Sequence, residues 1–338
     1  MATRPNITKL ADDLEFWNIL ISADSGAGKT VLAGSDTKVL FIAPEDKGLI
    51  SSKRINKSAN SDKITVAQWE DLMNAYEWFD ENPDELESFN VVVIDSLTEM
   101  QYLAKDYVLR MTADEKRRKQ QDPKKMQIQD YGMMHDCVEN LVRGFNDLPV
   151  NVLYTATAKQ VKDPDENPFI VPELTGKGDY GFAMKMVALM TSYGYMRVEI
   201  HDVPAPTEDD PKAIKTVKRR VVYFEDTGTI RGKDRTVTLA PYVVNPTMQK
   251  IRRCISGEMK RDSDGQIVKL GTPAKKAAAK ATPPNIEKAA QQPSPQGEDN
   301  VGSSEAPESD TNNEPIAPAS TVNEAKEDAP AELEAVDA

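Results

Sequence analysis

The segment from residue 23 to residue 30 has residue types and a spacing that can do chemistry. It reads Ala23-Asp24-Ser25-Gly26-Ala27-Gly28-Lys29-Thr30. This is the pattern G-x-x-x-x-G-K-[ST] of a P-loop, with alanine as a mild departure at the first glycine. Glycine lets backbone N–H groups converge on phosphate oxygens, and a helix that begins here directs its positive end at them. The segment therefore predicts a site for nucleotide phosphates.

Two side chains of this segment have separate expected roles. Lys29 is expected to bridge the β- and γ-phosphates of ATP, and Thr30 to place its hydroxyl on Mg²⁺. The alternative is a glycine-rich turn that matches the pattern by accident. An apolar, strand-like run precedes the segment at 17–21 and a short helical stretch follows it, and this context favours the P-loop.

An acidic residue ends the β-branched run 89–94, as in a Walker B strand. Asp95 is expected to hold Mg²⁺ through water, whereas the alternative is a helix N-cap after a buried strand. Ser96 follows, where many ATPases have the glutamate that activates water. The base must therefore lie elsewhere. Glu45, after the buried run 38–43, is the candidate, because ligands bind at the carboxyl ends of parallel strands.

Cations gather in one stretch between two predicted helices. Six of the ten residues from 116 to 125 are basic, namely Lys116, Arg117, Arg118, Lys119, Lys124 and Lys125. Such a run is either a solvated, mobile loop or a loop that binds the phosphate backbone of single-stranded DNA.

Further polar residues are candidates for sensing or completing a nucleotide site. The strand 150–157 ends in Thr157, where a polar side chain can sense the γ-phosphate, and Lys159 is a second candidate. Lys233 and Arg235 stand two positions apart on an extended stretch, so both point the same way and could reach the γ-phosphate of a neighbouring subunit. The alternative for these two cations is ordinary surface ion pairing.

The remaining pattern predicts helices, strands and one long loop. Helices are expected over 66–80, about 97–110 and 129–145, a long loop over 161–180, and strands near 187–197 and 218–225. A loop of that length inside a compact domain is usually functional or mobile.

Composition separates the last part of the chain from the rest. From about residue 271 the sequence has no aromatic residue, so it cannot bury enough apolar area to offset its ordering entropy and is expected to be disordered. Residues 289–338 carry twelve Asp and Glu against one Lys, so −11 of the net charge of −13 lies there and −2 remains for residues 1–288. The expected organisation is an N-terminal arm over 1–13, a nucleotide-binding domain over 14–256, and a linker with an acidic tail over 257–338.

Other function classes receive little support from the sequence. Cys137 and Cys254 stand alone without metal-ligand spacing, and His135 and His201 form no cluster, so reduced thiols of a cytosolic protein are expected. We identify no signal peptide and no apolar run of membrane-spanning length.

The chain resembles the phage-encoded minimal RecA-like ATPases, a group that includes single-strand-annealing and recombinase-like proteins. The resemblance covers about residues 14–256 and rests on the segment 23–30, Glu45, Asp95-Ser96, Gln129-Asp130-Tyr131-Gly132 and Gly232-Lys233-Asp234-Arg235. It implies an α/β fold, namely a RecA-like P-loop NTPase core with a mostly parallel central sheet flanked by helices.

The resemblance also implies how such a protein works. ATP and Mg²⁺ would bind at a subunit interface within a ring or filament of identical subunits on single-stranded DNA. Lys233 and Arg235 would be trans-acting fingers, Glu45 would orient water, and loops near 111–127 and 159–178 would contact DNA. The acidic residues Asp163, Asp165 and Glu166 depart from the last expectation, because they repel a phosphate backbone.

Three functions fit these observations. The first is a DNA-dependent ATPase for annealing or recombination during phage replication in the cytoplasm of a bacterial host. The second is a nucleotide-gated loader or adaptor that docks replication or recombination proteins, with the acidic tail as a docking strip. The third is a DNA-packaging motor, which is disfavoured because no nuclease carboxylate cluster and no second large domain accompany the core.

Overall fold

The computed structural model describes residues 14–44, 46–57, 60–113, 125–176, 178, 180–204, 214–261 and 267–269. The chain divides into two units, Met1–Lys276 and Ala277–Ala338, and every described residue belongs to the first. Glu45, the acidic tail and all cations of the 116–125 segment except Lys125 lie outside the described residues.

Strands and helices alternate in the first part of the described chain, from β1 to α4. In order they are β1 (Asn18–Ala23), α1 (Lys29–Ala33), β2 (Lys38–Ala43), α2 (Asp46–Ile55), β3 (Asn60–Thr65), α3 (Trp69–Glu81), the 3₁₀ helix η1 (Pro83–Ser88), β4 (Val91–Ile94), α4 (Leu97–Met111), α6 (Ile128–Asp147), β5 (Val152–Lys162), β6 (Pro168–Pro172), α7 (Gly181–Leu189), β7 (Ser192–Pro204), β8 (Ile214–Tyr223), β9 (Lys233–Asp234), β10 (Tyr242–Val244), α8 (Met248–Ile255), β11 (Met259–Arg261) and β12 (Ile267–Lys269).

One large sheet positions the rest of the described chain. Its strand order is β10-β8-β7-β1-β5-β4-β2-β3, and the six strands from β7 to β3 are parallel. Strands β8 and β10 extend it in antiparallel fashion, while β6 and β9 pair with β5 and β7. The prediction of an α/β, RecA-like fold with a mostly parallel central sheet flanked by helices is confirmed. The carboxyl ends of β1, β2, β4 and β5 meet at one edge, where ligands bind in such sheets.

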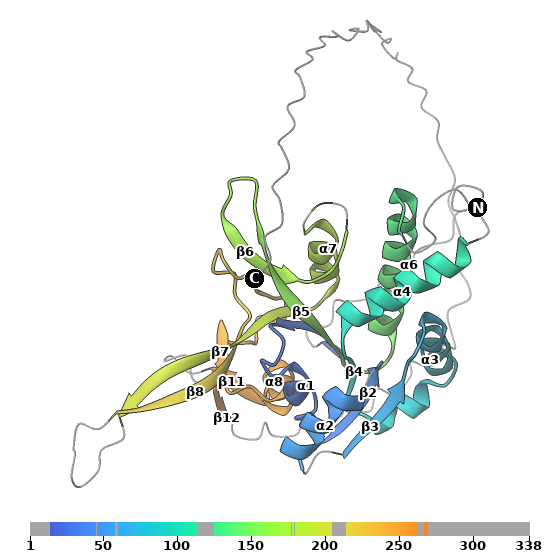
Figure 1. Ribbon diagram of the computed structural model, residues 1–338. Helices are drawn as coiled ribbons and strands as arrows, with labels where there is room; N and C mark the ends of the chain where they lie inside the picture. Colours follow the sequence, from blue (N-terminus) through green and yellow to red (C-terminus); the bar gives the residue numbers. More distant parts are fainter. Residues whose placement is uncertain are drawn as a thin grey trace, which may run out of the picture. The chain divides into compact units, whose positions relative to one another are not determined.

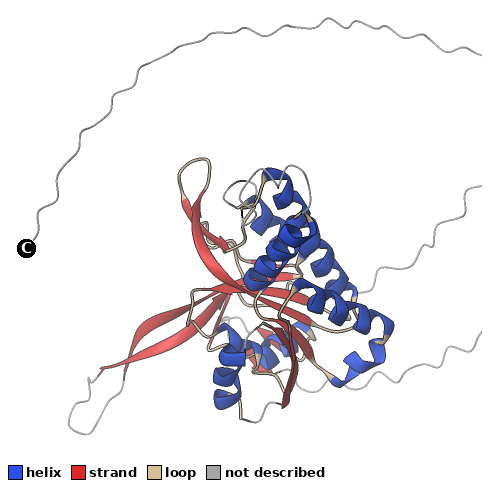
Figure 2. Ribbon diagram, turned by 45° about the vertical axis from the view of Figure 1, so that its right-hand side comes forward, coloured by secondary structure: helices blue, strands red, loops and turns tan. Residues whose placement is uncertain are grey.

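Side chains of the parallel strands alternate between two hydrophobic cores. Leu20 and Ile42 pack with α3, α4, α6 and α7 on one face of the sheet, whereas Ile21 and Phe41 pack with α1 and α8 on the other. Because successive strand residues point to opposite faces, a strand covered on both faces must be apolar throughout. Figure 1 and Figure 2 show the resulting layers, with the sheet between two groups of helices.

The amphipathic segments of the sequence form helices close to the predicted bounds. Helix α3 begins after Gln68, which forms a capping box with Asp71, and it ends before Pro83, as the Asn-Pro pair predicts. Helices α4 and α6 likewise occupy the segments predicted as 97–110 and 129–145.

Two segments differ from the sequence-based expectation. The segment expected as a loop over 161–180 contains β6, which pairs with the end of β5 from Lys162↔Pro168 to Ala158↔Pro172. The strand expected from 187 begins only at Ser192, because residues 181–189 form α7. That helix is apolar on almost every side, so its sequence has no periodicity that separates a buried helix from a strand.

Strands β7 and β8 form a long hairpin that projects away from the helices (Figure 1). Its base lies within the large sheet, where β7 also pairs with β1. A separate two-stranded sheet, β11 with β12, lies in the segment that the sequence predicted as linker. No described helix is long and apolar enough to cross a membrane.

Candidate functional site

The segment 23–30 forms a tight loop between β1 and α1. The N–H of Ala27 donates to the carbonyl of Asp24 at 3.2 Å, and the N–H of Leu32 donates to the carbonyl of Gly28 at 2.9 Å, which starts α1. Gly26 and Gly28 have φ angles of 78° and 105°, a region that favours glycine. The loop therefore has the backbone of a phosphate-binding turn at the carboxyl edge of the sheet.

Lys29 folds back over this loop. Its Nζ donates to the carbonyl oxygens of Ala23 at 2.8 Å and Asp24 at 3.2 Å. Burial lowers the pKa of Lys29, and the charges of Asp95, Asp24 and Glu173 act in the opposite direction. The ammonium is thus surrounded by carboxylates and carbonyls at the mouth of the loop.

Each carboxylate oxygen of Asp95 accepts a hydrogen bond from one threonine hydroxyl. The Oγ1 of Thr30 donates to Oδ2 at 2.7 Å, and the Oγ1 of Thr155 donates to Oδ1. Thr155 lies on β5, which is inserted between β1 and β4 in the sheet. The structure therefore brings together the P-loop threonine and the Walker B aspartate, as the sequence predicted, and adds a residue that the sequence did not identify.

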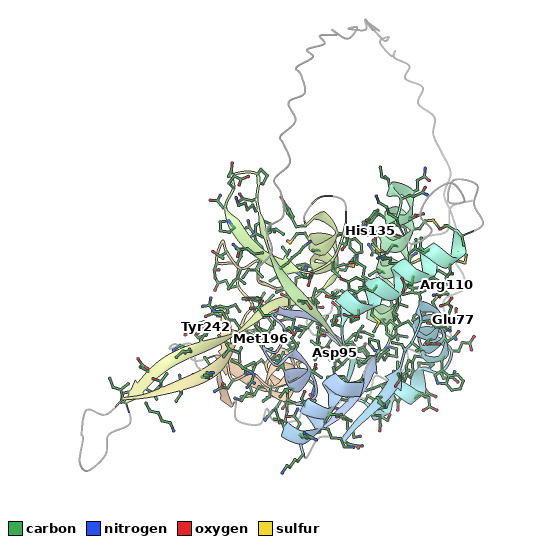
Figure 3. The ribbon with its side chains drawn as sticks, in the orientation of Figure 1. Glu77, Asp95, Arg110, His135, Met196 and Tyr242 are labelled. Carbon is green, nitrogen blue, oxygen red and sulfur yellow. The ribbon has the colours of Figure 1, made fainter. Side chains whose placement is uncertain are left out.

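The alternative role of Asp95 as a helix N-cap is not observed. The N-cap of α4 is Ser96, whose Oγ accepts the N–H of Glu99 at 3.3 Å. Asp95 instead lies at the end of β4 and faces the P-loop region around α1 (Figure 3). The hydroxyl of Ser96 therefore caps the N-terminus of α4.

Thr157, the predicted sensor, lies one step beyond the site on β5. Its backbone N–H donates to the Oγ1 of Thr98 at 3.1 Å, and its carbonyl accepts the N–H of Glu173 at 2.7 Å. No hydrogen bond of its own hydroxyl is recorded within the described residues. Thr157 thus anchors α4 and the segment after β6 through its backbone, and Thr155 is the threonine on β5 that contacts Asp95.

A cavity of about 600 Å³ lies beside the P-loop. Its lining combines Gly26, Gly28, Lys29 and Thr30 of the loop with residues from other elements, namely Asp95, Glu99, Arg220, Pro44, and Gly48, Ser51 and Ile55 of α2. Glu99 and Arg220 were not identified from the sequence, because they lie on elements that no phosphate motif marks. Glu45, the predicted base, immediately follows Pro44 but lies outside the described residues.

Lys233 lies far from the P-loop of its own chain and has an internal role. Its Nζ donates to the carbonyls of Val187 at 2.8 Å, Ala188 at 3.2 Å and Met190 at 2.8 Å, which closes the C-terminal end of α7. Burial, followed by the charge of Arg235, lowers the pKa of Lys233 to about 8. In this structure Lys233 therefore caps α7, and its role as a finger toward a neighbouring subunit stays a prediction.

Arg235 lines a larger cavity, of about 880 Å³, at the amino ends of β1 and β7. This cavity contains no P-loop residue, so it is not the phosphate site in spite of its size. Asp234, between the two cations, organises the turn by accepting the hydroxyls of Ser192 and Thr236 and the N–H groups of Thr238 and Leu239.

The residues predicted to contact DNA are described only in part. Lys116, Arg117, Arg118, Lys119 and Lys124 lie outside the described residues, and Lys125 is exposed. In the β5–β6 hairpin, Oδ1 of Asp163 accepts the N–H groups of Asp165 and Asn167 at 2.9 Å each. Glu166 pairs with Lys162. At least two of the three acidic residues therefore shape the turn of this hairpin.

One of three comparisons with known proteins identifies a family for this chain. The family model described as AAA domain matches residues 15–236. A search of curated proteins found no match. Among solved structures, the chain is similar to the KaiC-like protein PH0186 from the hyperthermophilic archaeon Pyrococcus horikoshii OT3, with 11% identity, coverage of 62% of this chain and 80% of that chain, and a TM-score of 0.31.

The fold and the site together define a nucleotide-binding P-loop ATPase with a RecA-like core. Because the family model covers more than half of the sequence, the chain belongs to the AAA domain family.

Proposed function

We propose that the protein hydrolyses ATP with Mg²⁺ and acts on single-stranded DNA in annealing, recombination or replication of a phage, within the cytoplasm of its bacterial host. The observation that carries the hydrolytic part is the pair of hydroxyls, from Thr30 and Thr155, on the carboxylate of Asp95 beside the P-loop. The DNA part is supported by the six cations of the 116–125 segment.

The residues at Asp95 fit a magnesium site. Hydroxyl and carboxylate oxygens are the ligands that Mg²⁺ prefers, and Thr30 Oγ1 lies 2.7 Å from Asp95 Oδ2. Thr30 would bind the ion directly and Asp95 through water. When bound, Mg²⁺ would supply positive charge that offsets the negative charge developing on the phosphates during transfer. Thr155 would fix the orientation of the Asp95 carboxylate.

The remaining steps are positioning and proton transfer by the chain itself. Backbone N–H groups of the loop and the ammonium of Lys29 would hold the phosphates, which accounts for most of the catalysis in this class of reaction. Glu45 would orient the attacking water from the carboxyl end of β2. Glu99 is a second carboxylate at the cavity and is the alternative if Glu45 is not the base.

We further propose that identical subunits assemble into a ring or filament. Arg235, whose side chain lines the 880 Å³ cavity at the edge of the sheet opposite the P-loop, would then approach the γ-phosphate of the next subunit. In this arrangement Arg235 is the stronger candidate for the finger role, because Lys233 is bound to α7.

One ATPase experiment tests the proposal. ATP turnover of the full chain, with and without single-stranded DNA, is compared with that of Glu45→Gln and of a variant in which Lys116, Arg117, Arg118 and Lys119 are replaced by alanine. Glu45→Gln is expected to bind ATP but to turn it over at least about 100-fold more slowly. The fourfold variant is expected to keep basal turnover and lose stimulation by DNA.

A control variant removes exposed lysines from other elements, Lys38 and Lys250, and should keep its stimulation. Undiminished turnover in Glu45→Gln rejects Glu45 as the base. Full stimulation of the fourfold variant rejects this segment as the DNA contact.

The second candidate function is a nucleotide-gated loader or adaptor for replication or recombination proteins. The charge distribution favours it, because residues 1–288 are nearly neutral and the acidic residues 289–338 could dock on a basic partner. Under this function, DNA neither stimulates turnover of the intact protein nor binds with steep salt dependence.

A further inference from the structure

Arg220 reaches the P-loop from an element that lies about 190 residues later in the sequence. It belongs to β8, at the base of the β7–β8 hairpin, where it pairs with Val198. Its Nε donates to the carbonyl of Ala27 at 2.9 Å, and its side chain lines the 600 Å³ cavity together with Lys29 and Asp95. The guanidinium is therefore part of the phosphate-binding cavity and not only of the hairpin.

The approach of Arg220 to the loop depends on a glycine. A Cβ atom placed on Gly28 would lie 2.6 Å from Nε of Arg220 and 3.3 Å from its Cδ and Cζ. A side chain at position 28 would thus displace the guanidinium from the loop, besides being strained at φ 105°. Gly28 serves the turn and also leaves room for Arg220.

The backbone of Arg220 is fixed from the other side of the hairpin. Its N–H donates to Oδ1 of Asn245 at 3.2 Å, and its carbonyl accepts the N–H of Asn245 at 2.6 Å. Asn245 directly follows β10, which pairs with β8. The guanidinium therefore extends from a strand position whose backbone is held on one side by β7 and on the other by Asn245.

Most of the guanidinium remains available to a ligand. Nε is bound to Ala27, and within the described residues neither Nη atom has a recorded hydrogen bond or ion pair. Guanidinium N–H groups form strong, charge-assisted hydrogen bonds with phosphate oxygens, often two at a time. A cation held at the wall of a P-loop cavity, with its terminal nitrogens free, fits a phosphate chain.

We propose that Arg220 binds the phosphates of the nucleotide from within the same subunit. The inference rests on the proposed nucleotide occupancy of this cavity and assigns it a further ligand. Because Arg220 is part of β8, the contact also connects the base of the β7–β8 hairpin to the nucleotide.

The test measures binding, not turnover. The affinities of the full-length protein for ADP, by calorimetry, and for pyrophosphate, by competition, are compared among the wild type, Arg220→Gln, Arg220→Lys and the control Arg219→Gln. Arg219 precedes Arg220 on β8, so its side chain points to the other face of the hairpin. Its cross-strand partner on β7 is Glu199. Arg220→Gln is expected to weaken both affinities about tenfold, and Arg220→Lys to restore part of the loss, while Arg219→Gln binds like the wild type.

Each outcome decides the inference. Equal ADP affinities of Arg220→Gln and Arg219→Gln overturn it, and so does a loss for ADP without a loss for pyrophosphate. Equal losses of affinity in Arg220→Gln and Arg220→Lys also overturn it. Both replacement side chains can donate an N–H to the carbonyl of Ala27, so the two variants differ in the positive charge that would bind phosphate. If the thermal midpoint shows that Arg220→Gln does not fold, the ADP and pyrophosphate affinities of Arg220→Lys are compared with those of Arg219→Lys instead. A loss of affinity in Arg220→Lys alone supports the inference, and equal affinities overturn it. A wild type that binds no ADP instead rejects the proposed function.

Discussion

A hydroxyl on β5 is one of the two that hold the Walker B carboxylate. The register pairs Ile94 with Tyr154, so Thr155 lies level with Asp95, and its hydroxyl donates to Oδ1. The sequence located Lys29, Thr30 and Asp95 because their motifs are local. It did not identify Thr155, because only the register of β5 against β4 places that residue beside Asp95.

Replacement of Thr155 by valine tests this arrangement. Thr155→Val keeps the shape of the side chain but leaves Asp95 Oδ1 without its donor, so kcat for ATP is expected to fall about 10- to 100-fold. Thr157→Val is the matched control and is expected to change kcat little. Steady-state turnover at saturating ATP and Mg²⁺ measures both, and a larger loss in Thr157→Val would restore the sequence-based assignment.

At the scale of elements, an ion pair with the buried Asp36 adds to the apolar packing that attaches α8 to the core. Nε of Arg252 lies 2.9 Å from Oδ2 of Asp36, in the turn before β2. Burial raises the pKa of Asp36, but hydrogen bonds from Arg252, Thr37 and Asn90 outweigh it and hold the pKa below its ordinary value. A carboxyl with a lowered folded pKa stabilises the fold above its unfolded pKa, and this contribution is lost as the pH falls through the folded pKa.

Replacement of Arg252 by glutamine tests how much this ion pair stabilises the fold. Its free energy of unfolding at pH 7 should be lower than that of the wild type by about 2 kcal/mol, since Asp36 keeps its burial but loses its charged partner. The difference should shrink as the pH falls below about 4, the ordinary aspartate value, and then through the lowered pKa at which the folded Asp36 carboxyl becomes protonated. Denaturant unfolding at several pH values measures it, with Arg253→Gln as control, because Arg253 lies on the same helix but pairs with the exposed Glu258. A difference independent of pH would assign the stabilisation to packing.

Elements with a regular apolar pattern were predictable, and others were not. Helices α3, α4 and α6 bury one stripe each, β4 is buried throughout, and β1 and β2 are buried from their second residue on, so periodicity and length identify them. Strand β6 begins and ends with proline and pairs only at the end of β5, which makes it resemble a loop in sequence. Long-range pairing, as between β5 and β1, leaves no local signal.

At the scale of the whole molecule, charge is divided unevenly along the chain. Residues 289–338 carry −11 of the net −13, so a protein that ends at Lys288 carries only −2. If the core binds single-stranded DNA, this truncation should tighten binding by about tenfold at low salt, because fewer like charges repel the phosphates. The gain should shrink at high salt, where charges are screened.

Fluorescence anisotropy of a labelled oligonucleotide, at about 50 and 200 mM salt, measures this effect. Basal ATP turnover of the truncated protein is the control and should match that of the full chain. Weaker DNA binding after truncation would contradict the expectation and would make the acidic residues part of the binding surface.

Strand β5 connects the candidate site directly to the turn of the β5–β6 hairpin. It runs without interruption from Thr155 beside Asp95 to Lys162 at the start of the hairpin turn. At about 3.3 Å per residue, these two residues are separated by about 23 Å. A tilt of about 5° at the buried end would therefore move the exposed tip by about 2 Å. If β5 tilts as a rigid strand, a small change beside the Asp95 carboxylate would become a larger displacement at the turn between β5 and β6.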